Sequence, residues 1–228
     1  QPAPGTTNEK AWIPVDAPER ELCFDVVLAL VPKEMRDTAQ IALFHLLDSA
    51  RAAGLTAAQF AYVLATVQHE SSFGLRMNEI WGPTAVQRGY EGRRRLGNTQ
   101  PGDGYRFRVR GYVQVTGRAN YAYWTKRLGI DLVNDPDLAT MPEVAAVIAV
   151  WGMRDGTFTG KRLSQFINDR QQDFYNARRV VNDIRSRVDR EVARDIATNA
   201  RRYFSKELLA ARLKDLRLSI SFSDTRAK

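Results

Sequence analysis

Residues 56–74 constrain the fold most strongly, because they combine a helix start, an apolar stripe and a helix end. Thr56 and Gln59 have the spacing of a capping box, in which two side chains satisfy backbone N–H groups of the first helical turn. The apolar residues that follow recur at helical spacing: Phe60, Val63, Leu64 and Val67. One face of this helix must therefore be buried, and the sequence predicts a core built around it.

Glu70 continues the apolar stripe, and Ser71, Ser72 and Gly74 are expected to end the helix just beyond it. A carboxyl group held against apolar walls loses the hydration of its charged form, which favours the protonated acid. A protonated glutamic acid near neutral pH can serve as a general acid. Glu70 is therefore a candidate catalytic residue. The alternative is a helix-end glutamate that bends back to solvent.

The composition fits a folded protein and offers no metal site. The chain has 228 residues, of which 44% are hydrophobic and 26% charged, enough for one large domain or one domain with appendages. A single cysteine, Cys23, excludes an internal disulfide framework, and with His45 and His69 it makes no zinc cluster. We expect no metal and no cofactor. No apolar run reaches the length of a membrane span, so stable membrane insertion is not expected.

The charge balance is strongly basic, with a formal net charge of +8 and a pI of about 9.8. Such a balance favours polyanionic partners: nucleic acid, acidic lipids or the anionic bacterial cell wall. The basic residues are scattered and show no zinc-finger or basic-zipper spacing, so binding to nucleic acid is not expected.

The chain is predicted to form one domain with an arm at each end. Residues 1–20 are rich in Pro, Thr and Gly and are expected to be a linker or N-terminal arm, residues 21–218 the domain, and residues 219–228 a polar tail. The first residue is Gln1, so an upstream domain or leader remains open.

Helical patterns dominate the predicted domain. Besides residues 56–72, helices are expected at 37–54, 119–127, 142–153, 163–167 and 188–218. In the first of these, Asp37 and Gln40 are expected to cap the helix, and its expected core residues are Ile41, Leu43, Phe44 and Leu47. Pro142 is expected at a first helical position, where its missing N–H costs nothing.

Residues 105–116 show the clearest extended pattern, because apolar and polar residues alternate. Alternation places the two sets on opposite faces of a strand. The polar face is predicted to carry Arg106, Arg108, Arg110, Tyr112, Gln114 and Thr116. We expect the arginines to be solvated. For Tyr112, Gln114 and Thr116, a solvated strand face and the wall of a binding cleft are both open.

Three passages resemble family 19 glycoside hydrolases, and in particular the chitinase-like lysozymes and endolysins of bacteria and phages. They are AYVLATVQHESSFG, LGNTQPGDGYRFRVRG, and RGYVQVTGRANY followed by LGIDLVNDPDLA. The resemblance spans about residues 56–204 and is densest in the middle third. It implies a mainly α, lysozyme-like, two-lobed α+β fold with a small extended element. The implied reaction is hydrolysis, with inversion, of β-1,4 bonds between N-acetylated amino sugars.

The resemblance also implies roles for individual residues. Glu70 matches the general acid that protonates the glycosidic oxygen. Gln114, Thr116 and Asn120 match polar residues that hold the sugar, and Asn182 matches an asparagine of a later Ile-Asn-Gly stretch, although Asp183 here replaces the glycine.

The general base is assigned less directly. An inverting enzyme needs a second carboxylate across the sugar, roughly 6.5–9.5 Å from the first. Glu79, nine residues after Glu70, fits the endolysin pattern, and Glu91 is the reserve candidate. Thr84 is a candidate for orienting the attacking water, and equally a loop-capping hydroxyl.

The sequence departs from the family pattern in two places. Val109 stands where relatives carry glycine, so the backbone there is expected to approach the substrate less closely. The cysteines of plant-type chitinases are missing, which favours the bacterial and phage branch, whose substrate is peptidoglycan. We therefore expect a muramidase-type hydrolase that acts outside the cytoplasm on the cell wall. A chitinase and a catalytically silent wall-binding module are the alternatives. A phage lysin, a secreted toxin with a cognate immunity protein, and a wall-remodelling enzyme would all share these motifs.

Overall fold

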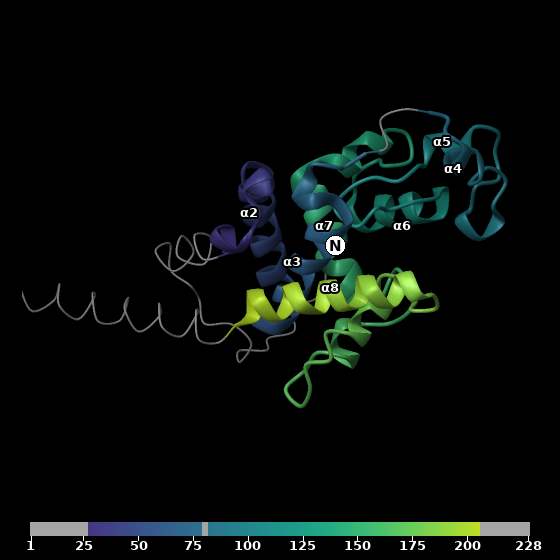
Figure 1. Cartoon of the computed structure of the whole chain (residues 1–228). Coiled ribbons are helices and arrows are strands. Elements are labelled where there is room, and N and C mark those ends of the chain that lie inside the picture. The colour runs from purple at the N-terminus through teal and green to yellow at the C-terminus, as the bar shows by residue number, and fades with distance from the viewer. Residues whose placement is uncertain (1–26, 79–81, 206–228) are drawn as a thin grey trace, which may run out of the picture.

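The computed structural model describes residues 27–78 and 82–205 (Figure 1). The predicted arm at residues 1–20, the tail at residues 219–228 and the candidate base Glu79 lie outside the described residues. The predicted domain of residues 21–218 is described in part.

The described residues are mainly helical, as predicted. The α-helices are α2 (Arg36–Ala52), α3 (Ala57–Ser71), α4 (Ala85–Arg88), α5 (Asp103–Arg106), α6 (Arg118–Leu128), α7 (Pro142–Asp155) and α8 (Arg187–Phe204). Short 3-10 turns lie between them: η1 (Lys33–Met35), η2 (Ser72–Gly74), η3 (Arg94–Leu96), η4 (Pro136–Thr140), η5 (Leu163–Gln165) and η6 (Asn176–Val180). Extended pairing within the described residues is limited to isolated bridges, two of which join Arg110 to Asn78 and to Val115.

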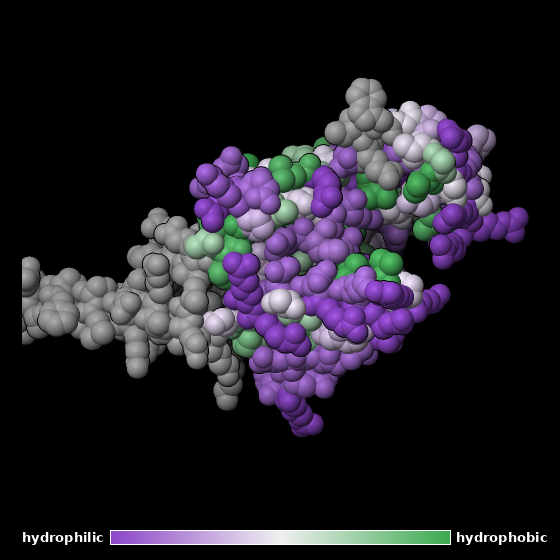
Figure 2. Space-filling view, viewed as in Figure 1, coloured by the Kyte–Doolittle hydropathy of each residue, from purple (hydrophilic) through white to green (hydrophobic). Residues whose placement is uncertain are grey.

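The larger lobe is a bundle in which α3 packs along α8 and α2 packs along α7 (Figure 1). Ten of the fifteen residues of α3 are buried, so this helix is the centre of the core, as its sequence predicted. The smaller lobe contains α4, α5, η3 and α6 and projects at the upper right of Figure 1. Figure 2 shows the surface hollowed between this lobe and α8.

The capping box of α3 is confirmed. The Gln59 backbone N–H donates to Thr56 Oγ1, and the Thr56 N–H donates to Gln59 Oε1. The helix ends where expected, because Ser72 and Phe73 adopt left-handed backbone conformations with φ of 52° and 54°. The chain therefore turns sharply away from the helix directly after Glu70.

The cap and core predicted for α2 are partly wrong. The helix begins at Arg36, and its N-cap, Met35, makes no side-chain capping bond. Leu43 and Leu47 are buried, but Ile41 and Phe44 are 55% and 46% exposed. The packing face is narrower than the sequence suggested, because alanines carry much of it: Ala39, Ala42 and Ala50. Because these side chains are small, α2 and α7 can approach each other closely, and the larger Ile41 and Phe44 are not part of the packing face.

The extended segment predicted for residues 105–116 is also wrong. Tyr105 and Arg106 end α5, and the chain then makes a tight reversal in which Arg110 and Val115 exchange backbone hydrogen bonds of 3.1 and 2.8 Å. Gly111 and Gln114 permit this reversal by adopting φ of 78° and 59°. Residues are buried on both sides of this segment, so the alternation of apolar and polar residues does not mark a solvated strand face.

Arg108 and Arg110 are buried instead of solvated. The Arg110 guanidinium donates to the backbone carbonyls of Arg106 and Arg108 and to Asp137. These bonds satisfy carbonyl groups that the reversal leaves without a ladder partner.

The helix predicted at residues 163–167 is wrong, because only Leu163–Gln165 form a turn, η5. Helix α8 is described to Phe204, and its predicted extension to residue 218 lies outside the described residues. Helix α7 begins at Pro142, as predicted. In the described ranges, no helix has both the length and the apolar character to cross a lipid bilayer.

Candidate active site

Glu70 lies in the last turn of α3, at the junction of the two lobes. The residues after it leave the larger lobe and reach the reversal of the smaller one, where Gly111 N–H donates to Met77 O at 2.8 Å. The side chain of Glu70 is 18% exposed. A carboxyl group is thus held by the rigid core on one side and open to solvent on the other.

Arg178 is the direct partner of Glu70. Its Nη1 lies 2.5 Å from Glu70 Oε1, and its side chain is only 8% exposed. The apolar wall that the sequence predicted around Glu70 is therefore wrong, since a buried guanidinium contacts the carboxyl group. Sequence reasoning missed Arg178. The sequence offered little to single it out, because Arg178 is one of two adjacent arginines that precede Val180 and Val181.

The base of the site is polar as well as buried. Tyr62, Thr66 and Glu70 lie four residues apart along one face of α3. Tyr62 Oη, Thr66 Oγ1 and Arg178 Nε are buried, and among the described residues none of them has a hydrogen-bond partner of normal geometry. Burial raises the pKa of the Tyr62 hydroxyl, although Arg178 acts to lower it. Glu70 thus stands on a layer of polar atoms, not on the aliphatic core.

Gln114, Thr116 and Asn120, which the sequence grouped together, form a connected polar ladder. Gln114 Nε2 donates to the carbonyls of Gly111 and Arg76, Thr116 Oγ1 donates to Gln114 O, and Asn120 Nδ2 donates to Thr116 O. The bond to Arg76 O fixes the ladder to the segment that follows Glu70. The structure therefore connects these candidate sugar-binding residues to the end of α3.

Tyr112 does not join this ladder. It is 2% exposed, and the space beside Gly74 is occupied by its ring, since a Cβ there would lie 3.3 Å from Tyr112 Cε1. Burial raises the pKa of its hydroxyl, and Glu143 acts in the same direction. The open face predicted for Tyr112 is wrong, and its observed role is packing between the lobes.

Two residues discussed in connection with the base have structural roles. Thr84 Oγ1 accepts from Gln87 N–H and caps α4, so the capping alternative describes its observed contacts. Both carboxylate oxygens of Glu91 accept backbone N–H groups, from Gly102 and Gly104, at 2.7 Å each. Glu91 thus holds a turn of the smaller lobe, which argues against it as the base. Glu79 lies outside the described residues.

Asn182 belongs to the segment that positions Arg178. Its backbone N–H donates to Arg178 O at 2.9 Å, and its side chain is exposed, with Oδ1 accepting from Asp183 N–H. The structure therefore brings Asn182 close in sequence and space to the partner of Glu70.

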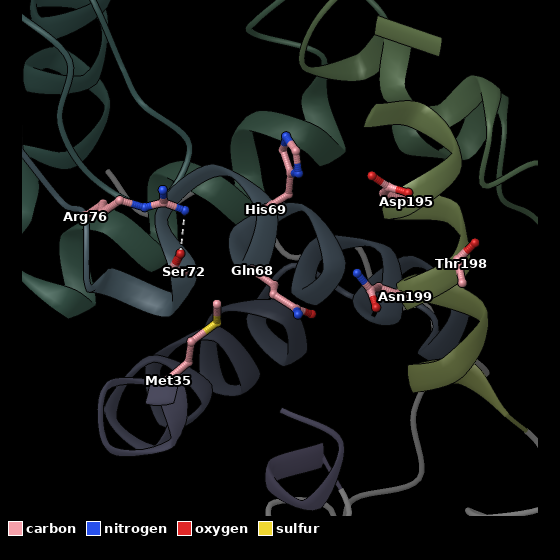
Figure 3. A pocket seen from close by; sticks show the side chains of 8 residues that line it. All are labelled: Met35, Gln68, His69, Ser72, Arg76, Asp195, Thr198 and Asn199. Carbon is pink, nitrogen blue, oxygen red and sulfur yellow. Dashed lines mark hydrogen bonds between the residues drawn. The ribbon is translucent and has the colours of Figure 1, made fainter. Parts of the chain in front are cut away.

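His69 borders a cavity next to Glu70 (Figure 3). Desolvation of part of the ring lowers the pKa of His69, and Glu70 acts in the opposite direction. Within residues 27–78 and 82–205, no group of three or more His, Cys, Asp or Glu side chains is placed to hold a metal ion.

Comparisons with known proteins agree with the motifs quoted above. No family model matches the chain. A segment of 59 residues, 25% of the chain, is 42% identical to a glycosyl hydrolase family 19 domain-containing protein of Haemophilus influenzae. This match spans only 29% of the length of that relative.

The fold resembles those of solved family 19 enzymes. Chitinase C of Streptomyces griseus aligns with 83% of this chain and 91% of its own, with a TM-score of 0.55 and 16% identity. A bacterial family 19 chitinase aligns with 83% of this chain and 93% of its own, with a TM-score of 0.50 and 19% identity. The resemblance to family 19 is therefore confirmed, and the chain has the mainly α, lysozyme-like fold of these chitinases.

Proposed function

We propose that this protein is a glycoside hydrolase that cleaves β-1,4 bonds in peptidoglycan, with Glu70 as the general acid. The observation that carries the proposal is Glu70 itself, a partly exposed carboxyl group at the lobe junction, held 2.5 Å from Arg178. The similarity to family 19 chitinases supports a reaction on an amino-sugar polymer.

The chemistry follows from the positions of these groups. For each turnover Glu70 takes up a proton from solvent and then donates it to the glycosidic oxygen as the bond to the anomeric carbon breaks, which returns Glu70 to the carboxylate that pairs with Arg178. The carboxylate left behind gains a negative charge at the atom that Arg178 contacts, so the guanidinium stabilises the charge as it develops. Gln114, Thr116 and Asn120 are proposed to hold the sugar.

Glu79 is proposed as the base that activates a water on the opposite face of the sugar, which gives inversion at the anomeric carbon. Its position nine residues after Glu70 and the engagement of Glu91 in the turn of the smaller lobe both support this choice.

Peptidoglycan is preferred over chitin because of charge. Bacterial walls are anionic, and the chain carries a formal net charge of +8. The protein is proposed to act outside the cytoplasm, where the wall is accessible. A chitinase is the second candidate, since the solved enzymes of the same fold carry that name.

Replacement of Glu70 tests the assignment. Glu70→Gln keeps the shape of the side chain but removes the proton donor, so hydrolysis of purified peptidoglycan should fall by about 10²–10⁴-fold. Glu191→Gln, an exposed carboxylate on α8, is the matched control and should retain activity. Unchanged hydrolysis in Glu70→Gln would contradict the assignment and leave a wall-binding module as the better description.

The same assay separates the remaining alternatives. Glu79→Gln should reduce turnover as strongly as Glu70→Gln, whereas Glu91→Gln should lower stability with a smaller effect on turnover at low temperature. Assays on purified peptidoglycan and on colloidal chitin then compare the two substrates directly. Faster release of sugar from chitin would favour the chitinase.

A further inference from the structure

A polar cavity of about 380 Å³ lies beside the proposed acid (Figure 3). It is open to solvent and is bordered by η1, the end of α3, η2 with the segment after it, and α8. Its lining residues are Met35, Gln68, His69, Ser72, Arg76, Asp195, Thr198 and Asn199. This volume lies within the range of small-ligand sites, which is roughly 300–1,000 Å³.

The cavity lies against the last turn of α3, the turn that carries the proposed acid. Successive residues of a helix are about 100° apart, so Gln68 and Ser72 lie on the side of α3 away from Glu70, with His69 between. His69 directly precedes Glu70 in α3 and lines the cavity together with Arg76 and Asp195. On the surface of α3, His69 therefore lies between Glu70 and the cavity.

The cavity wall is also tied to the proposed sugar-binding ladder. The backbone carbonyl of Arg76 accepts from Gln114 Nε2, while the Arg76 side chain lines the cavity and donates to Ser72 Oγ at 2.6 Å. On the opposite wall, Gln68 Oε1 accepts from Tyr203 Oη at 2.7 Å, which fixes the Gln68 amide with Nε2 as the donor. These hydrogen bonds therefore fix the orientation of two lining side chains, Arg76 and Gln68.

The lining chemistry suits a short peptide better than a sugar ring. Arg76 supplies a cation and Asp195 an anion, and amide and hydroxyl groups lie between them. Apart from the imidazole, none of the eight lining residues offers an aromatic face on which a pyranose could rest. A ligand with both a carboxylate and an amine would meet a partner of opposite charge at each wall.

We propose that this cavity is a subsite for the stem peptide of peptidoglycan. The inference rests on the proposed function, because the stem peptide hangs from the same glycan strand that Glu70 would cleave. Stem peptides carry free carboxylates and, at the diamino acid, a free amine. Chitin lacks such a branch, so the subsite would favour peptidoglycan over chitin.

Binding of a free peptide tests the subsite without any cleavage. The probe is the tetrapeptide of L-Ala, D-Glu, diaminopimelate and D-Ala, titrated into the Glu70→Gln protein and followed by amide chemical shifts. Shifts should concentrate at residues 68–76 and 195–199. Asp195→Asn and Arg76→Gln, each added to Glu70→Gln, should weaken binding by about fivefold or more. Glu191→Gln, one turn earlier on α8 and outside the cavity, is the control.

Cleavage by the otherwise unaltered protein gives the second readout. Intact peptidoglycan is compared with the same glycan after an amidase has removed its stem peptides. Asp195→Asn should raise KM on the intact polymer by about fivefold, with kcat and the rate on stripped glycan unchanged.

The two proposals fail in different ways. If the tetrapeptide does not bind, or if Asp195→Asn affects both glycans equally, the subsite is wrong while glycan hydrolysis stands. If neither glycan is cleaved but the peptide binds and Asp195→Asn weakens it, the subsite stands and the hydrolase assignment falls.

Discussion

At the scale of single residues, the pair of Glu70 and Arg178 dominates the proposed site. Both side chains are largely withdrawn from water, at 18% and 8% exposure. Burying two charges costs hydration that their attraction only partly returns, so such a pair contributes little net stability. Removing one partner is different, because it leaves the other charge buried without compensation. The energetic balance of this pair therefore suits the proposed catalytic role better than a role in stability.

Replacing Arg178 should therefore affect both stability and turnover. Arg178→Met leaves Glu70 without its partner, and we expect the free energy of unfolding to fall by about 3 kcal/mol. The double variant with Glu70→Gln should recover part of that loss, since no charge then remains buried. Urea denaturation measures the free energy of unfolding of the single and the double variant. Arg179→Met is the matched control: its exposed pair with Asp183 is expected to contribute under about 1 kcal/mol.

A double variant no more stable than Arg178→Met alone would contradict this account.

Single residues differ in how clearly the sequence indicates their role. Glu70 was identifiable because it lies on the stripe of its own helix. Arg178 was not, because it lies 108 positions away and no local period connects the two. The prediction for Tyr112 was wrong because a local pattern was misleading. Apolar and polar residues alternate around it, which predicts an open strand face, but its ring is buried.

At the scale of elements, helices with explicit start and stop signals were predictable and the smaller lobe was not. Thr56 and Gln59 start α3 and Pro142 starts α7, as the sequence indicated. Residues 105–116 misled because alternation indicates a strand only where one face meets water. Here buried arginines and two residues in the left-handed region replace the strand by a tight reversal.

Asp103 is the residue that joins the turn at residues 97–104 to α6. Its side chain is 1% exposed, and it accepts from the backbone N–H groups of Thr99 and Gln100 and from two nitrogens of Arg118. Hydrogen bonds from Arg118 are the main cause that holds the pKa of Asp103 below its usual value. This carboxylate must be ionised for the turn to keep its four donors satisfied.

Asp103→Asn should weaken the turn and change the response to acid. We expect the unfolding free energy at pH 7 to fall by about 2 kcal/mol, because charged hydrogen bonds are lost. In the parent protein, the Asp103 carboxylate contributes fully to the free energy of unfolding above its pKa in the unfolded state, about 3.9. This contribution is lost as the pH falls through the lower pKa of Asp103 in the folded state. Thermal unfolding between pH 7 and pH 2 should therefore be less acid-sensitive in the variant.

The control for that series is Asp169→Asn, which removes an exposed carboxylate outside the turn. It should leave both the stability at pH 7 and the acid response of the parent unchanged. An Asp103→Asn protein with the full acid sensitivity of the parent would show that other carboxylates determine it.

At the scale of the whole molecule, the sequence predicted the fold class through its motifs and the charge through simple counting. The arrangement of lobes came from the resemblance to a family, since no helical period reports which helices pack together. The charge has a consequence at this scale. With a formal net charge of +8, attraction to an anionic wall should act over distances beyond any single contact.

Salt should therefore weaken action on the wall far more than the chemical step. The screening distance is about 30 Å at 0.01 M salt and about 3 Å at 1 M. Long-range attraction is lost over this range, whereas the Glu70–Arg178 contact of 2.5 Å is too short and too buried to be screened as strongly. We expect hydrolysis of insoluble peptidoglycan to fall at least about tenfold across this range, mainly through KM. Hydrolysis of a short, neutral N-acetylglucosamine oligomer should change less than about twofold. Equal losses on both substrates would place the salt effect in the catalytic site, and would argue that the basic surface has no part in reaching the wall.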